Sequence, residues 1–245
     1  DLMDNAELRR GKPTVHKRWD ANTAILSGDS MLVLAYQQMA QCDETKLKPV
    51  MELFTETALE IGEGQQYDMD FEHRNDVTEA EYIEMIRLKT SVLLACAMKM
   101  GAILANAPQE DADLLYKFGE QIGLAFQLQD DFLDVYGDSK VFGKAIGGDI
   151  VCNKKTYMLI NAFNKANDKQ RAELKHWVEQ EQCNPQEKIA AITQLYNDMG
   201  IDKMAEQKIE HYFDCGKQLL DKVNVPTERK ANLINYALKM MNRKY

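Results

Sequence analysis

The sequence predicts an all-α protein that folds as a single domain over residues 1–245, and three observations favour this class. Apolar residues recur at helical spacing along most of the chain, and no segment shows the sustained alternation of period two that indicates a strand. No internal repeat, low-complexity tract or interdomain linker interrupts the pattern. With 245 residues and 45% hydrophobic content, the chain is long enough to bury one sizeable core.

The first third of the chain is predicted to hold one helix end and two long helices. Gly11 and Pro13 are placed to stop the first helix, because a glycine just past a helix and a proline beyond it are common stop signals. Gly62 and Gly64 are expected to close another helix in the same way. The predicted segments are a helix end at 1–8, helices at 22–41 and 46–61, and a polar connection at 68–76.

A capping box marks the next helix. Thr78 and Glu81 form a Thr-x-x-Glu pattern, so a strong helix is predicted to begin at Thr78 and to end at Asn106, where Pro108 follows. The remaining predicted elements are a helix at 110–136, a glycine-rich loop at 137–149, and helices at 157–166, 168–181, 185–199, 201–223 and 227–241.

The predicted helix that ends near residue 136 carries an acidic face. Gln127, Asp130, Asp131 and Asp134 share an arc of roughly 100° on this helix, and the rest of its circumference is largely apolar. A helix that is apolar almost all round is buried, and three buried carboxylates are unfavourable unless a cation faces them. Oxygen ligands at this density suit Mg²⁺. The alternative is a solvated acidic patch on an amphipathic helix.

Two glycines and a lysine extend this prediction. Gly119 and Gly123 lie near the acidic face, where larger side chains would fill space, so a cavity with glycine in its wall is expected. Lys89 lies on an apolar helical stripe, where a lysine is unfavourable unless it meets an anion or extends to solvent. Thr90 could offer a hydroxyl to the same site, or bond its own backbone.

A second group of charges lies at the start of the chain. Asp1 and Asp4 are three residues apart and are followed by Arg9 and Arg10. Guanidinium groups match phosphate oxygens with paired donors, so acid beside arginine suits a polyanion that is held partly by metal. Without the acids, such a basic loop is more often ordinary surface.

Two further lysines are candidates for phosphate binding. Lys144 lies in the glycine-rich loop, whose backbone amides could cradle a phosphate, and Lys154 follows ten residues later. None of the four histidines has ligand spacing, and no serine–histidine–acid pattern is present. Together these residues predict a site that binds Mg²⁺ and diphosphates at its mouth and an apolar chain below.

Charge and cysteine content limit the partners and the compartment. A net charge of −9 makes general nucleic-acid binding unfavourable. The five cysteines are scattered, which is typical of a reducing compartment, so a cytoplasmic location is expected. No run of 18 or more apolar residues occurs, so no membrane span is expected.

The order of these motifs resembles the trans-isoprenyl diphosphate synthases, the farnesyl and geranylgeranyl diphosphate synthase family. Residues 130–134 are similar to the second aspartate-rich motif of that family, and residues 1–4 to the end of the first motif without its leading aspartate. The other similar motifs, in family order, are Arg9-Arg10-Gly11, Gly64-Gln65, Lys89-Thr90, Phe126-Gln127, Gly143-Lys144 and Asn153-Lys154.

The resemblance implies a fold and a reaction. The fold is a homodimer-forming bundle of long helices around a deep central cavity, of the isoprenoid synthase type. The reaction is the condensation of isopentenyl diphosphate with an allylic diphosphate in isoprenoid biosynthesis, with Mg²⁺ as the cofactor. The expected product is short, farnesyl or geranylgeranyl diphosphate.

The resemblance also implies roles for individual residues. The metal would be held by Asp1, Asp4, Asp130 and Asp134, with Asp131 in support. The allylic diphosphate would be bound by Arg9, Lys89 and Lys144, and by either Lys154 or Lys155, since the preceding loop varies in length among family members. Isopentenyl diphosphate would lie against Arg10 and Phe126. The catalytic residues would be Lys89, Thr90 and Gln127, whose dipoles can face an allylic carbocation.

Two alternative functions stay open, a cyclase and a non-catalytic subunit. A class I terpene cyclase would also bind Mg²⁺ through carboxylates, and a non-catalytic subunit of a heteromeric synthase would share the fold. The chain opens at Asp1 without an initiator methionine, so we expect it to be truncated before the helices that the family places ahead of the first motif. Residues that set product length are expected in that missing part.

Overall fold

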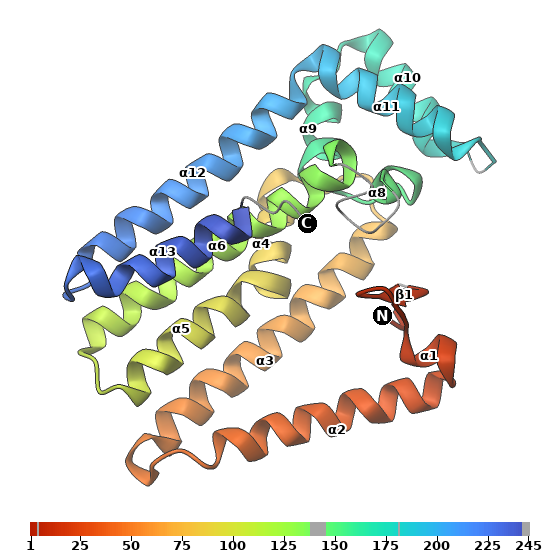
Figure 1. Ribbon diagram of the computed structural model, residues 1–245. Helices are drawn as coiled ribbons and strands as arrows, with labels where there is room; N and C mark the ends of the chain where they lie inside the picture. Colours follow the sequence, from red (N-terminus) through yellow and green to blue (C-terminus); the bar gives the residue numbers. More distant parts are fainter. Residues whose placement is uncertain (4, 138–145, 181, 242–245) are drawn as a thin grey trace. The chain divides into compact units, whose positions relative to one another are not determined.

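The computed structural model describes residues 1–3, 5–137, 146–180 and 182–241, and almost all of its regular structure is helical (Figure 1). The all-α class predicted from the sequence is confirmed. The chain divides into two compact units, residues 1–54 and residues 55–245. A single domain around a deep cavity stays a prediction.

The first unit begins with a short hairpin. Strand β1 (Leu8–Arg9) pairs antiparallel with β2 (Lys12–Pro13), so the predicted helix end at 1–8 and the expected absence of strands are both wrong here. Arg10 and Gly11 join the strands with φ angles of 51° and 73°. The glycine therefore serves a tight turn, which requires positive φ, instead of a helix C-terminus.

The first unit continues with α1 (Val15–Arg18) and α2 (Ala21–Met39). Asp20 caps α2, since its carboxylate accepts a hydrogen bond from the Thr23 backbone N–H at 2.8 Å. The predicted helix at 22–41 is confirmed within two residues.

Helix α3 (Glu44–Glu72) passes from the first unit into the second, and it does not end at Gly62 or Gly64. The predicted helix stop is therefore wrong, and so is the predicted connection over residues 68–72, which are helical. Residues 73–76 are not helical, as predicted. A Cβ atom on Gly64 would collide with the backbone nitrogen of Lys89 and would lie 2.8 Å from the Leu88 Cβ atom. This glycine allows two helices to approach closely.

After α3, the second unit continues with a long helical segment in three parts. They are α4 (Glu79–Ile86), a π-helical turn η1 (Arg87–Ser91) and α5 (Val92–Leu104). The predicted capping box is present, because the Thr78 side chain accepts from the Glu81 backbone and the Glu81 side chain accepts from the Thr78 backbone. Asn106, with φ of 56°, follows the last turn as predicted.

Helix α6 (Gln109–Tyr136) is central to the second unit. It packs against α5 on one side and α12 (Ile201–Lys222) on the other (Figure 1). The remaining helices are α8 (Gly148–Val151), α9 (Tyr157–Lys165), α10 (Asp168–Glu179), α11 (Pro185–Met199) and α13 (Thr227–Met241). In the described part of the chain, no helix is long and apolar enough to cross a bilayer.

The two glycines near the acidic face do not line an open cavity. A Cβ atom on Gly119 would lie 2.7 Å from the Ala95 Cα atom, and one on Gly123 would lie 2.5 Å from the Ser91 Cα atom. Both glycines are contact points where α6 meets the neighbouring helix. The expectation of a glycine-walled cavity at these positions is wrong, because the absent side chains make room for backbone.

Candidate active site

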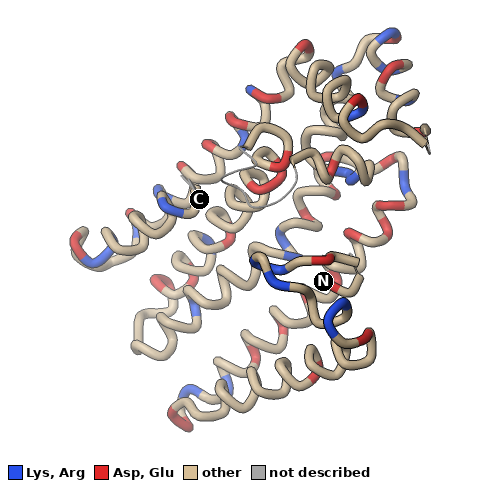
Figure 2. The backbone as a smooth tube through the Cα atoms, turned by 45° about the vertical axis from the view of Figure 1, so that its right-hand side comes forward, with Lys and Arg blue, Asp and Glu red and all other residues tan. Residues whose placement is uncertain are grey.

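The three aspartates of the acidic motif lie in the last two turns of α6, and they differ in burial. Figure 2 marks acidic residues red and basic residues blue along the backbone. Asp131 is 5% exposed, whereas Asp130 and Asp134 are half-buried. A carboxylate this well buried needs compensating partners. The alternative of a fully solvated acidic patch does not describe this face.

Both oxygens of Asp131 accept hydrogen bonds from the protein. The Tyr82 hydroxyl donates to Oδ2 at 2.5 Å, and the Gln127 amide Nε2 donates to Oδ1 at 3.0 Å. Thr90 Oγ1 in turn donates to Gln127 Oε1 at 3.1 Å. A continuous series of hydrogen bonds therefore connects η1 with the acidic motif, and it includes two of the residues predicted to be catalytic.

Sequence reasoning missed Tyr82. The available signal was the hydroxyl itself, because a buried tyrosine usually finds a hydrogen-bond partner. Tyr82 is 1% exposed, and burial followed by the charge of Asp131 raises the pKa of its hydroxyl well above the usual value. It therefore stays protonated and acts as a donor to Asp131.

Burial and like charge both act on the carboxylates of the acidic face. Burial raises the pKa of Asp131 to about 6, against the lowering effects of the Lys154 charge and the hydrogen bonds from Tyr82 and Gln127. Burial and the Asp131 charge raise the pKa of Asp149 to about 7. An added cation would favour the charged form of both carboxylates. The donor chemistry of this face therefore fits a hard divalent ion.

Asp149 is a second residue that sequence reasoning missed, because the loop around it was noted for its glycines. Its backbone N–H donates to Asp134 Oδ2 at 2.9 Å, and the Gly147 N–H donates to the Asp134 carbonyl at 2.6 Å. Asp134 thus ties the start of α8 to the end of α6. Within the residues that the structure describes, no three acidic, histidine or cysteine side chains already form a metal site.

Lys89 pairs with a buried carboxylate. Its Nζ atom donates to Asp68 Oδ2 at 2.5 Å, and Asp68 is 8% exposed. The Lys89 ammonium therefore meets an anion, which excludes the alternative that it only extends to solvent. Sequence reasoning missed Asp68 because α3 was expected to end earlier. The signal was its position one turn after Gly64, on the face that contacts Lys89.

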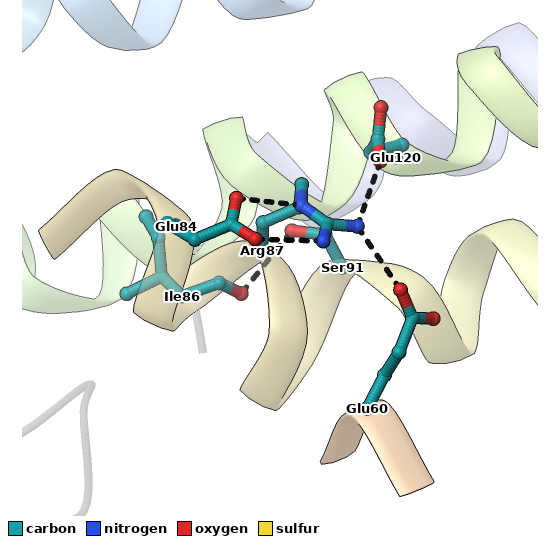
Figure 3. A network of polar contacts seen from close by, with 6 residues as sticks. All are labelled: Glu60, Glu84, Ile86, Arg87, Ser91 and Glu120. Carbon is teal, nitrogen blue, oxygen red and sulfur yellow. Dashed lines mark hydrogen bonds and ion pairs between the residues drawn. The ribbon is translucent and has the colours of Figure 1, made fainter. Parts of the chain in front are cut away.

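The π-helical turn that carries Lys89 and Thr90 is held by Arg87 (Figure 3). Arg87 Nε and Nη2 each donate to the Glu84 carboxylate at 2.8 Å. Its Nη1 atom lies 3.4 Å from both Glu60 on α3 and Glu120 on α6. Such π-turns are frequent at functional sites. Here the turn places Lys89 against α3 and Thr90 against α6.

Between the two candidate phosphate lysines, Lys154 is the one beside the acids. Its charge lowers the pKa of both Asp131 and Asp149. Lys155 instead donates from Nζ to the Asn153 carbonyl at 3.3 Å, and burial lowers its pKa. The effect of its charge on these two carboxylates therefore associates Lys154 with the acidic motif.

The remaining predicted residues lie in the first unit, elsewhere on α6 or outside the described residues. Asp1 and Arg9 lie in the first unit and form an exposed ion pair at 3.6 Å, and Arg10 lies in the hairpin turn. Phe126 is half-buried on α6. Asp4 and Lys144 fall outside the described residues. The expectation that the first unit contributes to the same site stays a prediction.

Comparison with known proteins identifies the family. The family model described as polyprenyl synthetase matches residues 1–198. The chain is 37% identical to a geranylgeranyl diphosphate synthase of Methanosarcina mazei, over 100% of this chain and 74% of that protein. It is 38% identical to a geranylfarnesyl diphosphate synthase of Natronomonas pharaonis, over 90% of this chain and 63% of that protein.

A solved structure gives the same result. A crystal structure of a geranylgeranyl pyrophosphate synthase matches with a TM-score of 0.94 and 42% identity, over 100% of this chain and 76% of that one. The helical fold is that of the solved prenyl diphosphate synthase it matches. The chain belongs to the polyprenyl synthetase family. It spans only part of the length of each of these relatives.

Proposed function

We propose that the protein condenses isopentenyl diphosphate with an allylic diphosphate and releases a short-chain prenyl diphosphate. The observation that carries this proposal is the acidic face of Asp130, Asp131, Asp134 and Asp149 beside Lys154, in a member of the polyprenyl synthetase family. A diphosphate brought with a divalent cation would meet both a lysine and carboxylates there.

The metal ligands on this face are proposed to be Asp130 and Asp134. Mg²⁺ takes one or two carboxylates, retains waters and completes its shell with substrate phosphates. Asp131 is better suited to orienting Gln127, because each of its oxygens already accepts a protein hydrogen bond. When bound, the metal supplies neutralisation of the charge that develops on the leaving diphosphate.

The polar residues around the face have complementary proposed roles. Lys154 and Lys89 would hold diphosphate oxygens, and the first unit would contribute Arg9 and Arg10. Thr90 donates to Gln127, and Gln127 in turn donates to Asp131, so the dipoles of Thr90 and Gln127 are fixed before substrate arrives. A fixed dipole costs no reorganisation when an allylic cation forms. The expected roles of Asp1, Asp4 and Lys144 are retained in the proposal.

Product length, oligomeric state and location complete the proposal. The relatives named above make products of different length by their names, so we propose a short chain and retain farnesyl or geranylgeranyl diphosphate as the expectation. A homodimer is proposed, and the exposed apolar side chains of α2, such as Met31 and Val33, favour it. A cytoplasmic location is proposed from the cysteine pattern.

The test is a product assay on the full-length protein. Labelled isopentenyl diphosphate is supplied with each allylic diphosphate in turn and with Mg²⁺, and the dephosphorylated prenyl alcohols are separated by chromatography. Incorporation of label into a longer linear alcohol is the expected result. Cyclic hydrocarbon from the allylic substrate alone would establish the cyclase alternative. Absence of any product would favour the non-catalytic subunit.

A further inference from the structure

A buried lysine lies next to the acidic face but outside it. Lys188 on α11 is 2% exposed, so its ammonium group is almost completely removed from water. Its Nζ atom donates to Asn153 Oδ1 at 2.6 Å and to the Val151 carbonyl at 3.3 Å. Both acceptors are neutral, and within the described residues no carboxylate forms an ion pair with Lys188.

Burial of this ammonium group without an opposite charge is unfavourable for folding, so a role that an apolar side chain could not fill is expected. A buried charge normally requires an opposite charge, and carbonyl and amide oxygens compensate for it only in part. Val151 is the last residue of α8, where unpaired carbonyls carry partial negative charge. Through its two hydrogen bonds, Lys188 therefore stabilises the end of α8 and the turn that follows it.

Asn153 connects Lys188 to the backbone of this turn. It adopts a φ of 55°, a left-handed conformation that asparagine tolerates better than most residues. Its Nδ2 atom donates to the Val178 carbonyl at 3.0 Å, while its Oδ1 atom accepts from Lys188. With both ends of the amide held, the turn has one defined geometry.

The next residue after Asn153 is Lys154. Its backbone N–H donates to the Asp149 carbonyl at 2.9 Å, and the Thr156 N–H donates to its carbonyl at 2.8 Å. Asp149 is itself hydrogen-bonded to Asp134 on α6. The backbone of Lys154 is thus fixed between α6 on one side and α11 on the other.

We propose that Lys188 is a positioning residue that holds Lys154 in place to bind diphosphate at the acidic face. The inference rests on the proposed function, because it takes the diphosphate role of Lys154 from there. Lys188 does not touch the substrate. It acts through Asn153, and without it the side-chain oxygen Oδ1 of Asn153 loses its partner.

A double-mutant cycle tests this dependence directly. The variants are Lys188→Met, Lys154→Ala and the two together, and the readout is the affinity for inorganic diphosphate with Mg²⁺, measured by calorimetry on the full-length protein. Lys188→Met should weaken binding about tenfold in the wild-type background and less than about twofold in the Lys154→Ala background. This non-additivity is specific to a residue that acts through Lys154.

Lys230 is a matched control for burial of a lysine. It is 7% exposed and donates to a backbone carbonyl, that of Asp221 at 2.8 Å, far along the chain on α13. Lys230→Met should change stability without changing the diphosphate affinity. If Lys188→Met fails to fold, Asn153→Gly replaces it, because glycine keeps the left-handed turn and removes the side-chain acceptor.

The outcomes separate this inference from the proposed function. An equal loss of affinity from Lys188→Met in both backgrounds, or no loss in either, would reject the positioning role while Lys154 keeps its own. Normal diphosphate binding by Lys154→Ala would remove the proposed role of Lys154, and the role of Lys188 would be rejected with it.

Discussion

At the scale of single residues, the buried Asp131 is the most constrained group in the candidate site. It accepts one hydrogen bond from Tyr82 on α4 and one from Gln127 on its own helix. Burial nevertheless raises its pKa to about 6, so these hydrogen bonds compensate only in part for the loss of water. The tyrosine hydroxyl is therefore expected to contribute measurably to stability.

Replacement of Tyr82 by phenylalanine tests this contribution. Tyr82→Phe removes the donor and leaves Asp131 Oδ2 without its buried partner, so we expect the free energy of unfolding to fall by about 1–3 kcal/mol. Tyr136→Phe is the control, because the Tyr136 hydroxyl bonds to Asn197 at an exposed position and its loss should cost less. Urea unfolding of the variants measures both. An equal change in the two would contradict the importance of the buried bond.

The residues that sequence reasoning found and missed differ in a physical way. Asp130, Asp131 and Asp134 could be predicted because their spacing places them on one helical face that is otherwise apolar. Asp68 and Asp149 were missed, because each gains its role through contact with another helix. Contacts between distant segments leave no periodic signal.

At the scale of elements, the glycines of the packed helices act in a way that sequence reasoning misjudged. Gly62 and Gly64 were expected to end a helix, yet both lie inside α3. Gly119 and Gly123 lie inside a helix as expected, but they do not line a cavity. At three of these four glycines a Cβ atom would collide with a neighbouring backbone, whereas Gly62 has open space. The pattern of glycines alone does not distinguish a helix stop from a close contact.

Alanine substitutions separate these cases. Gly123→Ala would place its Cβ atom 2.5 Å from the Ser91 Cα atom, so α6 would have to move away from the neighbouring helix. We expect a loss of about 1–3 kcal/mol in the free energy of unfolding. Gly62→Ala, with nothing within 4 Å, should instead stabilise α3 by up to about 1 kcal/mol. A stable Gly123→Ala variant would show that the helices are not in close contact.

The ion-pair cluster around η1 gives a prediction about pH. The hydrogen bond from Arg87 holds the pKa of Glu84 below its usual value, so Glu84 stabilises the fold above its unfolded pKa and loses this effect as the pH falls. Glu60, which also faces Arg87, has a pKa raised by burial and acts in the opposite sense, as the nearby Glu120 charge also disfavours its ionisation.

Glu84→Gln isolates the first contribution. The difference in the free energy of unfolding between wild type and Glu84→Gln should be largest near neutral pH and should shrink as the pH is lowered through the acid range. Thermal or urea unfolding at several pH values measures the difference. A difference that is constant, or that grows toward low pH, would contradict the ion pair with Arg87.

At the scale of the whole molecule, the all-α class and most helix positions could be predicted from the sequence, because long amphipathic and apolar helices have strong periodic signals. The helix at 185–199 and the helix at 227–241 agree with the structure to the residue. The short hairpin at residues 8–13 could not, because two-residue strands have no periodicity to detect. The family could be predicted because its motifs are spread along the whole chain, whereas the active site depends on a few contacts between distant segments.

The central claim is that the acidic face of α6 carries the chemistry of prenyl condensation. The most direct test is the initial rate of condensation, measured with labelled isopentenyl diphosphate at saturating Mg²⁺ for wild type, Asp130→Asn and Asp113→Asn. Asp113 lies on the same helix but forms a partly exposed ion pair with Lys99 at 2.7 Å. We expect Asp130→Asn to lower the rate by about 100-fold or more and Asp113→Asn to leave it within about twofold. A wild-type rate in the Asp130→Asn variant would contradict the claim.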